Sequence, residues 1–258
     1  MRADQLLVSK GLAPTRSAAA RLIAAGAAEW SGPAGWQVIR KAGEELNEHG
    51  ELRVSDDAEL RFVSRGGLKL EGALKHSGID VSGMCVLDIG QSTGGFSDCL
   101  IKAGAAKVVG VDVGHSQLHE QLRQHPQVVA LEHLHVRELA GSALTEHAPK
   151  GGFELIVGDL SFISMLGALP HLAAWAAPEG QVLLLVKPQF ELGKKALARG
   201  GLIKDVKQYP LLETQARSAA KDLGWKVLGY FESAITGGDG NKEFFLWAQT
   251  PGTEKDRP

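Results

Sequence analysis

The sequence predicts an α/β protein whose larger part is a Rossmann-like, doubly wound sheet of seven strands, the last of them antiparallel. From about residue 80, short apolar runs alternate with helical patterns, which is the order that builds a mostly parallel sheet. The last two runs are separated only by the turn-rich segment 236–241, so the final strand is expected to run backwards. The predicted strands are Met84–Ile89, Lys107–Val111, Val128–Glu132, Phe153–Val157, Val182–Lys187, Lys226–Phe231 and Glu243–Ala248.

The first 60 residues differ from the rest and predict a small α+β domain. Helical patterns cover Ala3–Lys10 and Arg16–Ala25, and Thr15 is a suitable N-cap for the second helix. Two short strand-like stretches, Leu52–Val54 and Leu60–Val63, follow a turn-rich segment. We therefore expect a small domain at 1–60, a larger domain at 61–250 and a disordered tail at 251–258.

Charge and cysteine content limit the possible classes of protein. The 258 residues carry a formal net charge of −2, so any contact with nucleic acid must come from local basic patches. The first 28 residues contain such an excess, with Arg2, Lys10, Arg16 and Arg21 against the single acid Asp4. The two cysteines form no metal-binding pair or disulfide framework, which fits a cytoplasmic protein. No signal peptide is recognisable, and no apolar run reaches the roughly 18 residues of a membrane helix.

The strongest motif is V-L-D-I-G-Q-S-T-G-G-F-S-D, which runs from Val86 to Asp98. It follows a predicted strand and opens a helix, where open α/β sheets bind nucleotides. A dinucleotide site requires G-x-G-x-x-G, but Ser92 stands at the second glycine, which argues against a pyrophosphate ligand. The Asp88 carboxylate at the strand end would repel a pyrophosphate and suits the cationic end of S-adenosylmethionine.

A second acid supports this interpretation. Asp112 ends the next strand, 24 positions after Asp88, near the spacing at which an acid accepts hydrogen bonds from ribose hydroxyls. The alternative is a glycine-rich turn whose two strand-end carboxylates serve only as caps. We interpret the segment as a site for S-adenosylmethionine, formed by Asp88, Gly90, Ser92, Thr93, Gly94, Gly95, Phe96, Asp112 and Asp159.

Four charged residues near strand ends are candidates for chemistry on a hydroxyl group. A hydroxyl must lose its proton to attack, and a neutral lysine can accept that proton while carboxylates orient the reacting groups. Asp159 follows the fourth predicted strand, and Lys187 ends the fifth. Lys69 lies on a helix ahead of the first strand, and Glu243 lies at the start of the last. Each alone could be a cap or a surface charge, so the hypothesis depends on their joint placement in one crevice.

Six stretches give the chain a specific resemblance: SRGGLKL, DIGQSTGGFSDCL, VVGVDVG, DLSFIS, LVKPQFELG and GNKEFF. In this order they resemble the TlyA, or haemolysin A-like, RNA methyltransferases, whose catalytic domain is similar to that of FtsJ-type ribose methyltransferases. The resemblance implies methyl transfer from S-adenosylmethionine to a ribose 2′-hydroxyl of ribosomal RNA. It also implies a Lys–Asp–Lys–Glu tetrad with Lys187 as the base, at Lys69, Asp159, Lys187 and Glu243.

The segment RADQLLVSKGLAPTRSAAARLIAAG resembles the small RNA-binding domain first seen in a small-subunit ribosomal protein. The expected partners are therefore ribosomal RNA or ribosomal subunits, with no membrane and no metal. Cations that could contact the RNA backbone are Lys10, Arg16, Arg21, Arg65, Lys194, Lys195 and Arg199. The alternative for each is an ordinary solvated helix face or loop.

Three other functions stay open at this point. A methyltransferase acting on a base amino group would carry an Asn-Pro-Pro-Tyr type of motif, where this chain has Asp159-Leu-Ser-Phe. A non-catalytic ribosome-assembly factor would not need the four charged residues. The haemolysin name suggests a membrane-lytic protein, although the sequence has no cationic amphipathic helix of the usual kind. The nine histidines form no H-E-x-x-H arrangement, and the oligomeric state is not predicted.

Overall fold

Two units, Met1–Arg65 and Gly66–Pro258, make up the chain. A computed structural model describes residues 1–32, 35–55, 57, 60–193, 196–198, 201–238 and 240–252. Most of the expected tail at 251–258 lies outside the described residues. Within these ranges, no helix is both long enough and apolar enough to cross a membrane.

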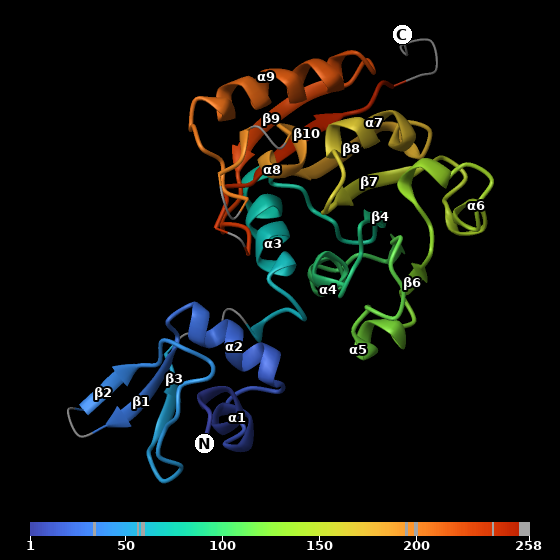
Figure 1. The fold of residues 1–258 in the computed structure, drawn as a ribbon. Helices are drawn as coiled ribbons and strands as arrows, with labels where there is room; N and C mark the ends of the chain where they lie inside the picture. The colour runs from blue at the N-terminus through green and yellow to red at the C-terminus, as the bar shows by residue number, and fades with distance from the viewer. Residues whose placement is uncertain are drawn as a thin grey trace. The chain divides into compact units, whose positions relative to one another are not determined.

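In the smaller unit, two helices pack on one face of a three-stranded antiparallel sheet (Figure 1). Helices α1 (Ala3–Ser9) and α2 (Arg16–Ala24) contact each other, and the Thr15 hydroxyl oxygen accepts a hydrogen bond from the Ala18 backbone N–H. The sheet order is β2-β1-β3, formed by β1 (Ala28–Gly32), β2 (Gly35–Val38) and β3 (Leu52–Val54). The core between helices and sheet includes Leu6, Leu7, Leu22, Ile23, Ala28 and Ile39.

The prediction of a strand at Leu60–Val63 is wrong. Residues 60–64 form a turn and bends instead of a strand. The Arg21 guanidinium on α2 donates hydrogen bonds to the carbonyl oxygens of Phe62 at 3.3 Å and Val63 at 3.5 Å. A side chain therefore satisfies two carbonyls that a neighbouring strand would otherwise have bonded.

The larger unit contains the predicted seven-stranded sheet, in the order β6-β5-β4-β7-β8-β10-β9. Strands β4 to β8 pair in parallel, whereas β10 is antiparallel to both of its neighbours, as predicted. The strands are β4 (Cys85–Ile89), β5 (Lys107–Val111), β6 (Val128–Leu131), β7 (Phe153–Gly158), β8 (Ala176–Val186), β9 (Lys226–Glu232) and β10 (Phe244–Gln249). Strand β8 begins before the predicted start at Val182, because an irregular stretch through Pro-Glu-Gly at 178–180 interrupts its apolar pattern.

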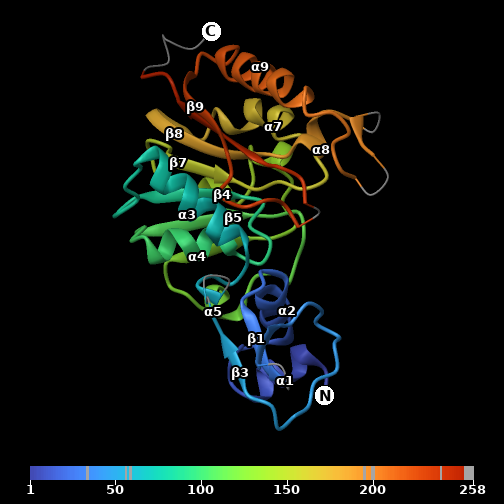
Figure 2. The same cartoon turned by 90° about the vertical axis from the view of Figure 1, so that its left-hand side faces the viewer.

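Helices cover both faces of this sheet (Figures 1 and 2). Helices α3 and α4 contact each other on one face, and α7 and α9 lie on the other. Right-handed crossovers explain this arrangement, because the strand order reverses between β4 and β7. The helices are α3 (Gly66–Ser77), α4 (Gly95–Lys102), α5 (Glu120–Arg123), α6 (Leu144–His147), α7 (Met165–Leu172), α8 (Pro188–Glu191) and α9 (Gln208–Lys221), with a 3₁₀ turn at Val136–Glu138.

Candidate active site

The carboxyl edge of the parallel strands collects polar residues that are far apart in the sequence. Gly90 follows β4, Asp112 follows β5 and Asp159 follows β7. The order of the strands reverses between β4 and β7, and open α/β sheets bind ligands at such switch points. The three residues therefore lie where a ligand site is expected.

The antiparallel strand β10 adds a residue to the same edge. Lys187 directly follows β8, and Val186 at the end of β8 pairs with Phe244 at the start of β10. Because β10 runs opposite to β8, Glu243 just before it reaches the edge at which Lys187 lies. Glu243, from near the end of the chain, thus lies at the same edge of the sheet as Gly90, which follows the first strand of the larger unit.

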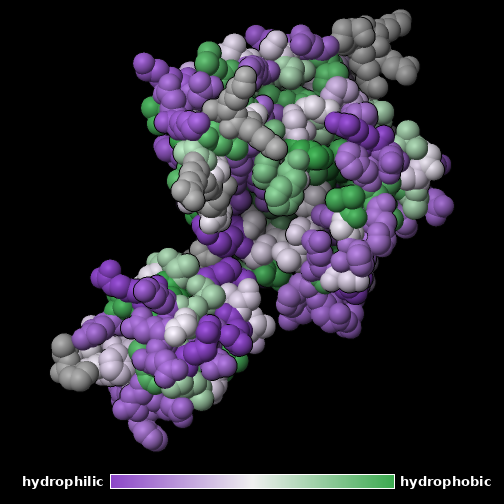
Figure 3. Space-filling model, viewed as in Figure 1, coloured by the Kyte–Doolittle hydropathy of each residue, from purple (hydrophilic) through white to green (hydrophobic). Residues whose placement is uncertain are grey.

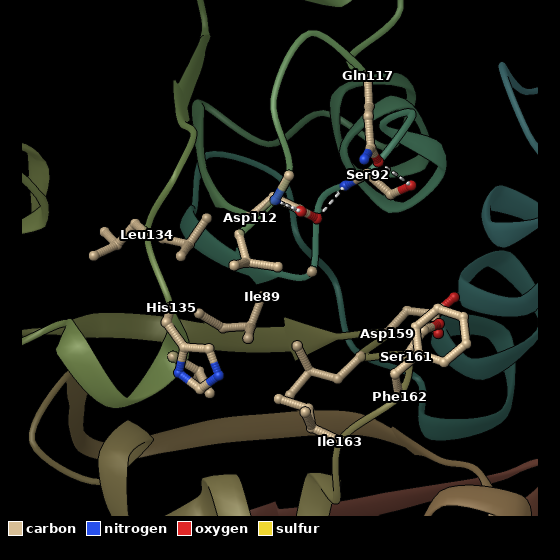
Figure 4. A pocket seen from close by; sticks show the side chains of 16 residues that line it. Ile89, Ser92, Asp112, Gln117, Leu134, His135, Asp159, Ser161, Phe162 and Ile163 are labelled. Carbon is tan, nitrogen blue, oxygen red and sulfur yellow. Dashed lines mark hydrogen bonds between the residues drawn. The ribbon is translucent and has the colours of Figure 1, made fainter.

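A cavity of about 430 Å³ opens at this edge (Figure 4). Figure 4 shows Asp112 and Ser92 on one wall and Ser161 and Phe162 on another. Most of the lining is apolar, and the size is typical of a small-molecule site. The apolar lining residues include Ile89, Val111, Leu134, Val136, Leu160 and Ile163.

The Asp112 carboxylate organises the polar wall. One of its oxygens accepts a hydrogen bond from the Ser92 backbone N–H at 2.8 Å, and the other accepts one from Gly114 at 2.7 Å. Ser92 has a left-handed φ of 47°, and its hydroxyl donates to the Gln117 side chain at 3.2 Å. Ser92 therefore keeps the backbone shape that glycine usually supplies. Each Asp112 oxygen retains a lone pair that can accept from a ligand hydroxyl.

Two glycines of the motif are required by close packing. Gly90 has a φ of 85°, and a Cβ there would lie 2.7 Å from the Asp159 backbone oxygen. Gly94 has a φ of 94°, and a Cβ there would lie 2.3 Å from the Leu122 side chain. Only glycine combines this backbone conformation with the missing Cβ. Gly90 thus lets the loop after β4 contact the end of β7 beside the cavity.

The residues expected to bind the cofactor divide into two groups. Those that line the cavity are Gly90, Ser92, Asp112 and Asp159. Those outside its described lining are Asp88, Thr93, Gly94, Gly95 and Phe96. Asp88 is fully buried and accepts a hydrogen bond from the Ser97 hydroxyl at 2.7 Å. Burial raises the pKa of Asp88 to about 7, which weakens the negative charge that a cationic ligand group would need. A contact between Asp88 and such a group stays a prediction.

The four charged candidates form one connected set. The Lys187 ammonium lies 2.5 Å from one Asp159 oxygen, and the Lys69 ammonium lies 3.9 Å from the other. Lys69 also lies 2.6 Å from the Glu243 carboxylate. The side chain of Glu243 is only 2% exposed, and those of Lys69 and Lys187 are 9% and 10% exposed. Cations and anions alternate, so each buried charge has an opposite charge beside it.

Sequence reasoning missed two residues that follow Asp159. The Ser161 hydroxyl accepts a hydrogen bond from the Lys187 ammonium at 2.8 Å. Phe162 lines the cavity, is 88% exposed and has a φ of 68°. Its ring centroid lies 5.4 Å from that of Phe190. The available signal was their position in the D-L-S-F segment directly after a strand.

Gln117 and His135 also line the cavity; the position of His135 after the third strand was a signal, whereas Gln117 had none. The His135 ring nitrogen Nδ1 accepts a hydrogen bond from the Arg137 backbone N–H at 3.1 Å. Both residues reach the cavity from loops, whose shape the strand pattern does not encode. Across the part of the chain that the structure describes, no group of three or more His, Cys, Asp or Glu side chains could hold a metal ion.

The candidates for RNA contact differ in what they already bind. Arg16 forms an ion pair with Asp4 at 2.9 Å, and Arg21 bonds the carbonyls described above. Lys10 is exposed and lines an open depression on the smaller unit, whereas Arg65 is partly buried. Outside the described residues lie Lys194, Lys195 and Arg199. Contact of these cations with RNA stays a prediction.

The cavity fits a methyl donor of the nucleoside type. Its apolar walls suit a flat purine, and the Asp112 carboxylate suits ribose hydroxyls. A family model described as FtsJ-like methyltransferase matches residues 62–250. The 16S/23S rRNA (cytidine-2′-O)-methyltransferase TlyA of Mycobacterium tuberculosis is 41% identical over 96% of this chain and 90% of its own length.

The chain belongs to the TlyA family of FtsJ-like methyltransferases. A second relative, Hemolysin A of Brachyspira hyodysenteriae, is 35% identical and covers 95% of this chain and 98% of its own length. The solved structure of a haemolysin-named chain from Streptococcus thermophilus has a TM-score of 0.72 and 37% identity, and it covers 98% of this chain and 89% of its own. This TlyA-family chain is therefore a methyltransferase, and its methyl donor is S-adenosylmethionine.

Proposed function

We propose that this TlyA-family chain methylates a ribose 2′-hydroxyl of ribosomal RNA, with Lys187 as the proton acceptor. The name of the Mycobacterium tuberculosis relative, which specifies ribosomal RNA and a cytidine 2′-oxygen, supports the substrate. The high identity over nearly the full length of both chains supports carrying that substrate over. A ribosomal RNA substrate would place the activity in the cytoplasm.

The observation that carries the proposal is the buried chain of charges beside the cavity. It runs from Glu243 through Lys69 and Asp159 to Lys187. A charge network of this kind is costly for stability, since burial removes water from every member. Asp159 belongs both to this network and to the lining of the cofactor cavity, so the network lies where it can act on a group beside the bound cofactor. When bound there, S-adenosylmethionine supplies a methyl group on a positively charged sulfur.

The contacts of Lys187 suit a base. A neutral lysine has two N–H groups and one lone pair. Asp159 at 2.5 Å and Ser161 at 2.8 Å can accept the two N–H groups. The lone pair is then left for the proton of the ribose hydroxyl, which moves to Lys187 Nζ as the oxygen attacks.

Lys69 and Glu243 have a positioning role in this proposal. Glu243 holds the Lys69 ammonium at 2.6 Å, and Asp159 lies on the other side of it. Lys69 is thus fixed beside the carboxylate that orients Lys187, where its N–H groups can bind a ribose oxygen. Asp159 is shared by the two lysines and sets the distance between them.

The test is to incubate the purified chain with methyl-labelled S-adenosylmethionine and separated ribosomal subunits, and to map the label by nuclease digestion and mass spectrometry. We expect label on a ribose, its loss in Lys187→Ala, and its retention in the control Lys75→Ala, an exposed lysine of α3. Label on a base would reject the hydroxyl chemistry. No label on any RNA, with cofactor binding intact, would favour a non-catalytic assembly factor.

The haemolysin name of one relative is tested separately. A membrane-lytic protein releases dye from liposomes without a methyl donor. We expect no release from vesicles of neutral or anionic lipid at concentrations that methylate RNA. Release that Lys187→Ala leaves unchanged would assign a second, independent activity to the chain.

A further inference from the structure

The sheet of the smaller unit has an outer face that carries an unusual side chain. Strand register separates the two faces: Trp30 pairs with Leu52 on the helix side, and Trp36 pairs with Ser31 on the opposite side. The outer face of such a sheet normally carries polar residues. The smaller unit is mostly hydrophilic in Figure 3, yet Trp36 is 40% exposed.

Arg53 lies beside the Trp36 ring. The guanidinium carbon of Arg53 lies 4.3 Å from the ring centroid. Its Nε also donates a hydrogen bond to the Glu29 carboxylate at 2.5 Å. Arg53 on β3 therefore contacts side chains of both β1 and β2. A cation close to the face of an aromatic ring is attracted to it. Trp36 is thus an exposed aromatic ring with one cation beside it.

Trp36 also lines an open depression of about 380 Å³, together with Lys10, His49 and Glu51. Lys10, His49 and Glu51 are exposed. Arg53, which lies beside the Trp36 ring, is not among the described residues that line this depression. The depression is therefore lined by one aromatic ring, two basic side chains and one carboxylate that can accept hydrogen bonds.

This combination is the chemistry that recognises an unpaired nucleotide. Bases that are not paired stack on exposed aromatic rings, and their phosphates contact lysine or other basic groups. A carboxylate such as Glu51 can accept hydrogen bonds from base N–H groups. We propose that this depression binds an unpaired nucleotide of the RNA substrate, with its base on Trp36 and its phosphate at Lys10. The inference rests on the proposed RNA substrate.

RNA binding by stacking on Trp36 would depend on salt concentration differently from binding by the basic residues considered above. Contacts between cations and phosphates weaken as salt increases, because binding releases counterions. Stacking of a base on Trp36 does not depend on counterion release. Removing the ring should therefore weaken binding by a similar factor at every salt concentration, whereas removing Lys10 should reduce the salt dependence itself by about one ion.

The experiment measures dissociation constants of the full chain for protein-free ribosomal RNA and for intact subunits. Trp36→Ala is expected to weaken binding to both about tenfold, within the range for the loss of one stacked base. Trp36→Phe should retain most of the affinity. The matched control is Val38→Ala, a residue of similar exposure on the same strand that does not line the depression. Cofactor affinity and thermal unfolding check folding, and Trp36→Leu replaces Trp36→Ala if the latter does not fold.

Each other outcome overturns the proposal in a distinct way. Unchanged RNA affinity in Trp36→Ala or Trp36→Leu, with methylation by the unaltered chain intact, rejects this site and leaves the proposed function standing. Weaker binding to subunits but not to protein-free RNA assigns the surface to a ribosomal protein. An unaltered chain that neither binds nor methylates RNA rejects the proposed function together with this site.

Discussion

Asp4 in the smaller unit and Asp159 in the larger unit each lie between two cations. Arg2 at 3.0 Å and Arg16 at 2.9 Å bind Asp4, and the arginine side chains are 45% and 56% exposed. The cations at Asp159 are the nearly buried Lys187 and Lys69. Hydrogen bonds from Arg2 and Arg16 hold the pKa of Asp4 well below its usual range. The arrangement is similar, but the two clusters differ in the type of cation and in how far the cations are buried.

The type of cation separates a structural ion pair, at Asp4, from one that can take part in a reaction, at Asp159. Arginine stays protonated in proteins, so the Asp4 cluster joins α1 and α2 for as long as Asp4 is ionised. Lysine can lose its proton, so the Asp159 cluster can change its charge during a reaction. Burial strengthens this contrast, because a buried charge responds strongly to the loss of its partner.

Lys187→Arg gives the first and largest expected effect, because it makes the Asp159 cluster resemble the Asp4 cluster. Arginine keeps the positive charge beside Asp159 but cannot accept a proton. We expect methyl transfer to slow by about 100- to 10,000-fold, the usual contribution of a general base. Single-turnover methylation measures this, with cofactor affinity unchanged. A rate close to that of the control Lys75→Arg would show that Lys187 is not the base.

Asp88 extends the comparison to a carboxylate that is buried against a hydroxyl. Its folded pKa of about 7 lies above the ordinary 3.8, so the folded state holds a proton that the unfolded state loses. The free energy of unfolding should therefore fall as pH rises from about 4 to about 7, by at most about 4 kcal/mol. Asp88→Asn should flatten this fall in urea unfolding measured across that window. Parallel curves for the two proteins would contradict the assignment.

Glu243→Gln tests the outer end of the buried set. The amide keeps the shape of the side chain and removes the charge that holds Lys69 at 2.6 Å. Loss of a hydrogen bond between charged groups corresponds to a rate reduction of about 10- to 100-fold. The matched control is Glu232→Gln, which breaks an exposed ion pair with Lys242 and should leave the rate unchanged. Equal rates for both variants would remove Glu243 from the proposed mechanism.

Asp4→Asn should have the smallest effect. It removes the charge of a side chain that is only 5% exposed, but the amide can still accept hydrogen bonds from the half-exposed Arg2 and Arg16, so we expect a lower thermal unfolding midpoint and unchanged cofactor affinity. The lowered pKa of Asp4 means that its stabilisation is present at neutral pH and is lost as pH falls through the folded-state pKa. The difference between variant and unaltered chain should therefore shrink in acid. A constant difference at all pH values would point to a packing effect instead.

The placement of the charged set could be predicted because strand ends are visible in the sequence. The predicted strands end at Val111, Val157 and Lys187, so Asp112, Asp159 and Lys187 were expected at one edge. The turn-rich segment before Phe244 indicated the direction of the last strand and hence the position of Glu243. The sheet, its strand direction and the family were confirmed, while the roles of the four residues stay predictions.

The shapes of loops, and hydrogen bonds made by side chains from other parts of the chain, could not be predicted. The left-handed φ of Ser92 and Phe162 depends on contacts within the folded protein, since neither residue type favours that region. Leu60–Val63 had the apolar pattern of a strand, but the guanidinium of Arg21 took two of its carbonyls. The hydrogen bond from Ser97 to the buried Asp88 had no signal in the sequence, and the contact of Asp88 with a ligand stays a prediction. Each outcome depends on a partner distant in sequence or on local backbone geometry.

The antiparallel direction of β10 has a consequence for how the protein is made. The residues that line the cofactor cavity all lie between Ile89 and Ile163, whereas the charged set is complete only with Glu243. A chain emerging from the ribosome therefore contains the whole donor-binding segment before the last acidic member has been synthesised. Glu243 is the last of the four charged residues to be translated, so an enzyme proposed to modify ribosomes has its charged set complete only after nearly all of the chain has been made.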